Sequence, residues 1–315
     1  MPEPTVDIHH HILPPAYMQA LGERIGHQGL FGSPPAWTPQ ISLEVMDRNG
    51  IDCAIVSISA PGVWFGDAHE SDRLARDCND YGARMKAEFP TRFGFFATLP
   101  LPDVEATLRE IERACGILRA DGVVLMTNYG GIYPGDVALR PVFEELDRRR
   151  AVVFFHPMAA TYANPLPHIP APSLEFPFET TRAITSLLYG GTLARCRAAR
   201  FVFAHAGGAV PFLALRIARL TARSEFAACV PEGVLAELRR LHFDTALAAN
   251  EFAFGPLLRL TSASNVMFGS DFPHAGEETL AATLRGLEGL ELTEMQRADI
   301  KGRNAHRLCL RRDVR

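Results

Sequence analysis

The chain has 315 residues, of which 47% are hydrophobic, and its formal net charge is −4. This length allows one large core or two domains. The mild acidity argues against a nucleic-acid-binding protein, which usually carries a basic surface. No apolar run approaches the roughly 20 residues that a membrane span requires. The six cysteines are scattered without a Cys-x-x-Cys pair, so we expect reduced thiols in a cytoplasmic protein.

Short β-branched or aromatic runs alternate with longer helical patterns along the chain. The predicted strands cover 6–11, 53–59, 92–98, 122–126, 151–156, 199–205, 241–244 and 265–269. The predicted helices cover about 68–89, 103–118, 138–149, 179–190, 210–222, 251–260, 277–287 and 294–308. This alternation predicts a parallel sheet, and near-continuous apolar strands such as 152–155 fit strands that are buried on both faces.

Eight such units favour an α/β fold in which one domain, residues 1–315, forms a closed (β/α)8 TIM barrel. An open doubly wound sheet is the alternative. It would need a Gly-rich phosphate loop after the first strand, where this chain has His-His-His-Ile-Leu-Pro-Pro. Two segments rich in Pro, 26–40 and 158–177, follow strands one and five, and we expect them to be loops at the active-site face. They are either lids or plain surface excursions.

Ionisable side chains stand at the ends of four predicted strands. Side chains alternate along a strand, so His9 and His11 point the same way and His10 points the other way. The other strand-end residues are His156, His205 and Asp271. In a parallel barrel all the carboxyl ends of the strands lie on one face, so these side chains are expected to converge.

Three histidines and one aspartate suit Zn²⁺, or Mn²⁺ if further oxygen ligands join, and one more imidazole remains for acid–base catalysis. Taken singly, His156 or His205 is at least as often a structural core histidine. His274 follows Asp271 closely and either lines the pocket or belongs to an ordinary loop. The chain contains no Walker A loop, Gly-x-Ser-x-Gly elbow or Gly-x-Gly-x-x-Gly motif, which disfavours nucleotide binding and serine-nucleophile chemistry.

Motifs around these positions resemble the decarboxylase branch of the amidohydrolase superfamily. They are DIHHHILP at 7–14, FHP at 155–157, AHAGG at 204–208 and FGSDFP at 268–273, and the likeness covers nearly the whole chain. Aminocarboxymuconate semialdehyde decarboxylases and γ-resorcylate decarboxylases belong to this branch. The segments 61–67, 127–129, 174–182 and 243–246 are similar to the subgroup that acts on 6-methylsalicylate.

The resemblance implies roles for the residues at the strand ends. The metal ion, Zn²⁺ or alternatively Mn²⁺, would be bound by His9, His11, His156 and Asp271. His205 would be the acid–base or orienting histidine beside it. Arg216 stands where some relatives have an arginine that reaches a neighbouring subunit's site, which implies a homodimer or higher homo-oligomer. The remaining substrate contacts would come from Trp64, Phe65, Phe176, Phe178 and His274.

These roles predict a metal-dependent, non-oxidative decarboxylase of a small aromatic carboxylate, a 2-hydroxybenzoate similar to 6-methylsalicylate. Some relatives carry arginines just before the position of Met46, and 37–44 has none here, which favours a less charged acid over a dicarboxylate. Asp271 is the preferred proton donor to the ring carbon, with His205 holding it or the phenolate. The alternatives are a hydrolase of a lactone or amide that uses metal-activated water, and a non-catalytic metal-binding module.

Overall fold

The computed structural model describes residues 4–26, 34–159, 166 and 168–309. Its eight strands form one sheet in chain order, and each strand is parallel to the next. The strands are β1 (Val6–His11), β2 (Cys53–Ser57), β3 (Phe93–Thr98), β4 (Gly122–Met126), β5 (Val152–His156), β6 (Arg200–Phe203), β7 (His242–Asp244) and β8 (Val266–Met267). Backbone hydrogen bonds from β1 to the segment after β8, such as Ile8 N to Phe268 O at 3.0 Å, join the two ends of the sheet. The predicted (β/α)8 TIM barrel is therefore confirmed.

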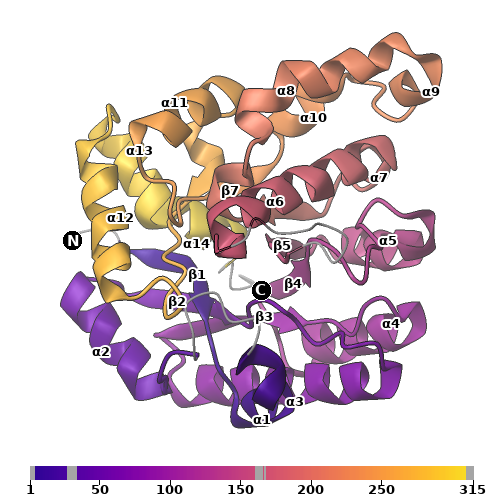
Figure 1. The fold of residues 1–315 in the computed structure, drawn as a ribbon. Helices are drawn as coiled ribbons and strands as arrows, with labels where there is room; N and C mark the ends of the chain where they lie inside the picture. The colour runs from indigo at the N-terminus through magenta and orange to yellow at the C-terminus, as the bar shows by residue number, and fades with distance from the viewer. Residues whose placement is uncertain (1–3, 27–33, 160–165, 167, 310–315) are drawn as a thin grey trace.

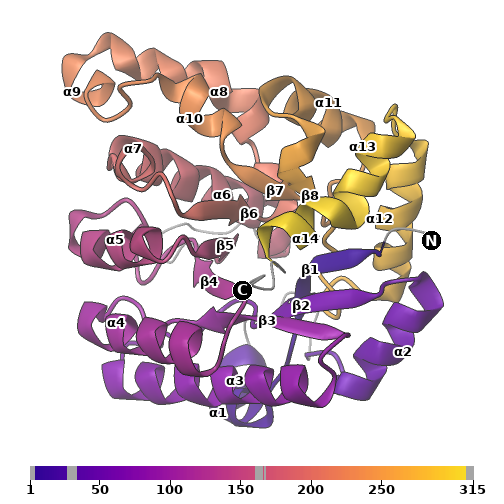
Figure 2. The same ribbon diagram turned by 180° about the vertical axis from the view of Figure 1, so that it is seen from behind.

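Helices surround the strands on the outside of the barrel (Figures 1 and 2). Before β6 they are α1 (Pro15–Gly26), α2 (Pro39–Asn49), α3 (Ala68–Glu88), α4 (Val104–Glu112), α5 (Arg140–Arg148), α6 (Ala171–Tyr189) and α7 (Thr192–Arg195). After β6 they are α8 (Val210–Ala218), α9 (Ser224–Ala227), α10 (Val234–Arg239), α11 (Glu251–Leu260), α12 (Glu277–Gly289), α13 (Glu294–Ala298) and α14 (Asn304–Leu308). Among the described residues, no helix combines the length and the apolar character needed to cross a membrane.

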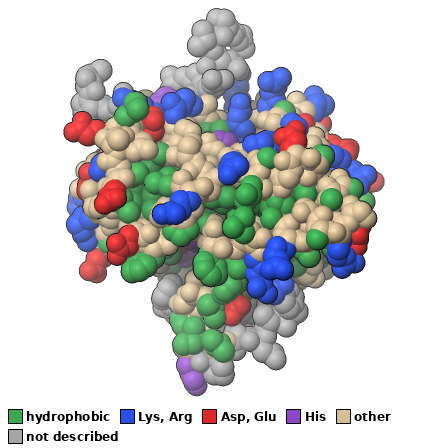
Figure 3. Space-filling model, turned by 90° about the horizontal axis from the view of Figure 1, so that it is seen from above, with side chains coloured by type: hydrophobic (Ala, Val, Ile, Leu, Met, Phe, Trp, Pro, Cys, Tyr) green, Lys and Arg blue, Asp and Glu red, His purple; other side chains and the backbone are tan. Residues whose placement is uncertain are grey.

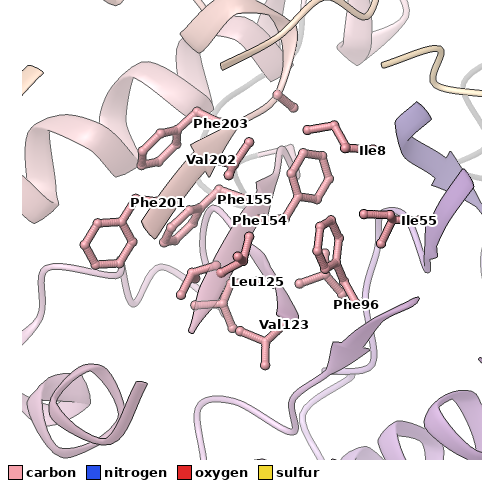
Figure 4. Close-up of a cluster of buried hydrophobic side chains, with 14 of the residues drawn as sticks. Ile8, Ile55, Phe96, Val123, Leu125, Phe154, Phe155, Phe201, Val202 and Phe203 are labelled. Atoms are coloured by element: carbon pink, nitrogen blue, oxygen red, sulfur yellow. The ribbon is translucent and has the colours of Figure 1, made fainter. Parts of the chain in front are cut away.

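Aromatic side chains from the central strands fill much of the core (Figure 4). Phe154 and Phe155 of β5 are fully buried, as is Phe203 of β6. The rings of Phe155 and Phe203 stack with their centroids 4.7 Å apart. Because burying one such side chain stabilises the fold by about 2–3 kcal/mol, these strands form a rigid support for the loops at their carboxyl ends.

The structure corrects the predicted loop segments. Segment 26–40 was expected to be a loop after β1, but α1 precedes it and α2 begins inside it at Pro39. Thr38 caps α2, with its hydroxyl accepting a hydrogen bond from Ile41 N at 3.2 Å. Helix α6 begins at Ala171, eight residues before the predicted start at 179. The lid interpretation concerns 27–33, 160–165 and 167, which lie outside the described residues.

The early start of α6 is explained by the positions of its prolines and by its contacts with a distant segment. Pro172 occupies the first turn of α6, where the missing N–H is not needed, and Pro177 lies inside the helix. The carbonyl of Pro177 accepts a hydrogen bond from the hydroxyl of Thr181 at 2.8 Å. That hydroxyl in turn accepts a hydrogen bond from the backbone N–H of Ala209 at 2.9 Å. These contacts tie α6 to the segment that follows β6, so a proline-rich sequence forms a helix over the carboxyl face of the barrel.

Candidate metal centre

Four candidate ligand side chains converge at the carboxyl ends of three strands. One ligand atom from each of His9, His11, His156 and Asp271 lies within 4.8 Å of the others. The two Nε2 atoms of His9 and His11 are 3.0 Å apart. Oδ1 of Asp271 lies 3.0 Å from His11 Nε2 and 3.3 Å from His9 Nε2. The strand-end histidines and the aspartate thus surround one point, with the fifth side chain, that of His205, beside them.

The outer nitrogens of the three histidines all face acceptors. Nδ1 of His9 lies 2.6 Å from Oδ2 of Asp244, a residue that ends β7. Nδ1 of His11 lies 3.2 Å from Ser57 O, and Nδ1 of His156 lies 2.8 Å from Pro157 O. A carbonyl or carboxylate acceptor requires Nδ1 to carry the proton, so each Nε2 offers its lone pair to the centre. The donor set fits a divalent metal ion, because three imidazole Nε2 atoms and a carboxylate converge on one point.

The charges around His9 also favour the binding of a cation at this centre. Burial lowers the pKa of His9, but Asp244 and Asp271 outweigh burial and raise that pKa to about 10. Burial alone would raise the pKa of Asp271, yet the charge of His9 and the close imidazoles of His11, His205 and His9 hold it well below its usual value. Two buried carboxylates therefore stabilise positive charge at the point where the ligand atoms meet. A bound cation would supply that charge.

His11 and His156 are kept neutral. Burial is the main cause that lowers the pKa of His11 to about 3. Burial, reinforced by the neighbouring His11 and His9, holds the pKa of His156 well below its usual value. A histidine binds a metal ion only in its neutral form, so both side chains are in the state that coordination requires.

Unusual backbone geometry brings the ligands together. The register of β1 against β2 shifts between Asp7 and His10, so β1 contains a bulge just where its histidines begin. Asp271 has φ of 62°, and its N–H donates to His9 O at 2.8 Å. His205 has φ of 54°. These left-handed conformations turn both side chains toward the cluster, and such strain in non-glycine residues concentrates at functional sites.

His205 stands beside the cluster with its ring free of hydrogen bonds. Its Nε2 lies 3.5 Å from Oδ2 of Asp271. His9 and His11 contact the other carboxylate oxygen, Oδ1. Its backbone N–H donates to Oδ1 of Asp244 at 2.8 Å. Both ring nitrogens are buried and have no hydrogen-bond partner among the described residues. This side chain is therefore available to bind or protonate a substrate that occupies the centre.

The structure separates the predicted substrate-contacting residues into two groups. Phe176 is buried, with its ring centroid 6.1 Å from that of His156, and the ring of His274 lies 5.4 Å from that of His11. Trp64 and Phe65 are partly buried and pack against the core.

Phe178 and Arg216 form the second group, because both are exposed in the single chain. Phe178 is 44% exposed and lies two residues from Phe176, so the two rings leave α6 on different sides. Arg216 lies on the outer face of α8. A contact of either residue with the substrate stays a prediction.

Asp244 is the residue of this site that the sequence reasoning missed. It holds His9 through Oδ2, and through Oδ1 it accepts the N–H groups of His205 and Ala246 at 2.8 and 3.0 Å. It therefore connects a ligand histidine to the candidate acid–base histidine. The signal was present, since Asp244 ends a predicted strand just as the other site residues do.

Comparisons with known proteins agree with this geometry. The chain is 38% identical over 303 residues to "Decarboxylase yanB" of Aspergillus niger, covering 91% of this chain and 82% of that protein. It is 36% identical over 295 residues to 6-methylsalicylic acid decarboxylase of Penicillium expansum, covering 92% and 91%. The crystal structure of a protein described as amidohydrolase II superposes with a TM-score of 0.91 at 29% identity, over 97% and 99% of the two chains.

The family of this chain is shown by a match that covers almost all of its length. The sequence profile of the family described as amidohydrolase matches residues 6–309, which include every ligand candidate from His9 to Asp271. The match therefore spans the barrel and all the strand ends that build the metal centre. This chain belongs to the amidohydrolase family.

Proposed function

We propose that this protein is a metal-dependent decarboxylase of a 2-hydroxybenzoate-type aromatic acid similar to 6-methylsalicylate. The observation that carries the proposal is the placement of the free His205 ring 3.5 Å from Oδ2 of Asp271, at the edge of a three-histidine, one-aspartate centre. Its substrate assignment is supported by the 36% identity to 6-methylsalicylic acid decarboxylase. The named relatives are decarboxylases, so the hydrolase alternative is not retained.

The proposed mechanism must avoid a build-up of negative charge on the aromatic ring. Direct loss of CO₂ would leave an unstable carbanion on the ring, so a proton must first reach the ring carbon that bears the carboxylate. A divalent ion held by His9, His11, His156 and Asp271, Zn²⁺ or alternatively Mn²⁺, would supply Lewis-acid stabilisation of the substrate's negative charge. The buried rings of Phe154 and Phe176 beside His9 and His156 keep water away from the reacting carbon.

We assign the proton transfer to Asp271, with His205 as its partner. The lowered pKa of Asp271 keeps its carboxylate ionised at rest, so Oδ2 would carry the proton only in passing. It would receive the proton from Nε2 of His205 and deliver it to the ring carbon, forming a C–H bond and a dearomatised ring. The bond from that carbon to the carboxylate then breaks, its electron pair restores the aromatic ring, and CO₂ leaves. Nε2 of His205, 3.5 Å from Oδ2, would supply that proton again in the next turnover.

Metal removal tests this proposal. Chelation should abolish CO₂ release from a panel of 2-hydroxybenzoates that includes 6-methylsalicylate, and reconstitution with Zn²⁺ or Mn²⁺ should restore it. The expected loss is complete within detection, because ring protonation depends on the ion's electrostatic stabilisation. A protein that binds metal tightly yet releases no CO₂ from any of these acids would contradict the assignment.

We also propose that the protein forms a homodimer or higher homo-oligomer through the face that carries α8 and α11. Phe212 and Leu215 of α8 are 83% and 71% exposed, and Phe252 of α11 is 85% exposed. Figure 3, which views the molecule from this side, shows hydrophobic side chains with Lys and Arg among them. Such exposed apolar patches are typical of protein–protein interfaces. Arg216, on the same helix, would then lie at the subunit contact.

A charge placed on this face should separate the subunits. We expect light scattering after gel filtration to give a mass of at least twice 34.6 kDa for the wild-type chain and about 34.6 kDa for Leu215→Asp. Burying an unpaired carboxylate in an interface costs several kcal/mol, which is enough to dissociate a dimer at micromolar concentration. The matched control is Ile117→Asp, which charges a 76% exposed side chain outside α8 and α11. A monomeric wild type, or an equal effect of both variants, would refute the proposed interface.

A further inference from the structure

A buried chain of hydrogen bonds runs from Trp37, near the start of α2, to the segment that carries Asp271. Trp37 Nε1–H donates to Ser42 Oγ at 2.8 Å, and Ser42 Oγ lies 2.8 Å from Nε2 of His10. Nδ1 of His10 lies 3.0 Å from Oδ2 of Asp7. Ser42, His10 and Asp7 are fully buried. His10, which points away from the metal centre, is the middle link.

The hydrogen bonds of this chain all have the same donor-to-acceptor direction. The carboxylate Oδ2 of Asp7 accepts, so Nδ1 of His10 donates, and in the neutral imidazole Nε2 is then the acceptor for the hydroxyl of Ser42. The Ser42 hydroxyl can donate to His10 while one of its two lone pairs accepts the indole N–H of Trp37. Each donor therefore points toward the Asp7 carboxylate, and the side chain of His10 is fixed in one tautomer at both ring nitrogens.

The Asp7 carboxylate connects this hydrogen-bond chain to the strained segment after β8. Its Oδ1 accepts the backbone N–H groups of His9 and Ser270, both at 3.0 Å. Its Oδ2 also accepts the hydroxyl of Ser270 at 2.5 Å, and Ser270 Oγ accepts the N–H of Phe272 at 3.1 Å. The residues on both sides of Asp271 are thereby held, and Asp271 between them is the one with φ of 62°.

We propose that Trp37, Ser42, His10 and Asp7 act together as positioning residues for Asp271. None of the four is among the clustered ligands, yet their hydrogen bonds end on the residues that flank Asp271 and on the N–H of His9. They hold the carboxylate in its left-handed turn, where Oδ1 faces His9 and His11 and Oδ2 faces His205. The inference rests on the proposed metal centre. It adds that hydrogen bonds starting at Trp37, outside the barrel, hold one of the metal ligands in place.

Metal affinity is the measurement that separates this role from a purely structural one. The dissociation constant for Zn²⁺ is measured by competition with a chromophoric chelator, together with thermal unfolding of the metal-free protein. We expect His10→Leu to weaken Zn²⁺ binding by about 10–100-fold, since second-shell partners typically contribute that much. His10→Asn, which keeps a donor for Asp7, should recover most of the loss. With metal at saturation, kcat should fall while the substrate KM stays within twofold, because the chain acts on Asp271 rather than on the substrate.

A serine pair provides the milder variant and its control. Ser42→Ala removes the link between Trp37 and His10, and we expect it to weaken Zn²⁺ binding by about 3–10-fold even if His10→Leu does not fold. Ser71→Ala changes another buried helical serine, whose hydroxyl has no partner among the described residues, and should leave the affinity unchanged. Zn²⁺ binding within twofold of wild type in Ser42→Ala, and in His10→Leu where it folds, with an equal kcat, would overturn the inference while leaving the metal centre intact. A wild-type protein that binds no divalent ion would instead refute the proposed function itself.

Discussion

Replacing Asp271 by asparagine should lower kcat for CO₂ release by at least about 10³-fold, the upper part of the range for a lost general acid–base group. Asparagine has nearly the same shape and keeps one oxygen that can face His9 and His11, so the ligand cluster should survive. Its amide cannot hold a transferable proton at the position of Oδ2, opposite His205. The measurement is kcat at saturating substrate, with the metal content of each sample determined in parallel.

The metal content decides how the Asp271→Asn result is interpreted. A variant that retains metal and loses turnover supports a role in proton transfer, whereas one that loses both has lost a ligand. His205→Ala is the companion variant, and we expect it to reduce kcat by about 10²-fold or more, because Asp271 would lose the group that reprotonates it. If Asp271→Asn keeps turnover within tenfold of wild type with metal bound, the proton donor is not Asp271. A complete loss in His205→Ala alone would then assign that role to His205.

Much of the fold follows from patterns that are local in the sequence. Strand β4 at 122–126 and helix α11 at 251–260 have the predicted bounds, because apolar β-branched residues define the former and Asn250 caps the latter. The convergence of His156 with the β1 histidines follows from topology alone, since parallel strands bring their carboxyl ends to one face. The sequence therefore predicts the place of the site without predicting its shape.

The shape depends on contacts between distant residues. No local pattern predicts the bulge after Asp7 or the positive φ at His205 and Asp271, because tertiary hydrogen bonds maintain these conformations. The same holds for the first turns of α6, whose prolines indicate a loop until the packing of Pro177 against Gly208 is known. A Cβ on Gly208 would lie 2.0 Å from Pro177 O, so this close approach requires glycine.

Replacing Asp244 by asparagine should weaken Zn²⁺ binding by about 10–100-fold and lower kcat by a similar factor, as is typical when the partner of a ligand histidine is changed. In the native site Oδ2 of Asp244 accepts the Nδ1 proton of His9 at 2.6 Å, while Oδ1 accepts the N–H groups of His205 and Ala246. Asparagine has only one oxygen, and the two backbone donors hold it. Its NH₂ group then faces His9 and favours the tautomer with the proton on Nε2, which points that proton at the metal position.

A second aspartate distinguishes this effect from general loss of stability. Asp147 also accepts two backbone N–H groups, from Ala198 and Ala199 at 2.6 and 2.8 Å, but it lies at the opposite, amino-terminal end of β6. Asp147→Asn should lower the melting temperature and leave Zn²⁺ affinity unchanged, whereas Asp244→Asn should lower the affinity even where its metal-free protein melts normally. Equal affinities in the two variants would mean that His9 binds the ion without help from its carboxylate partner. The 2.6 Å contact between Nδ1 of His9 and Oδ2 of Asp244 argues against that result, because this carboxylate keeps the proton on Nδ1 and leaves Nε2 for the ion.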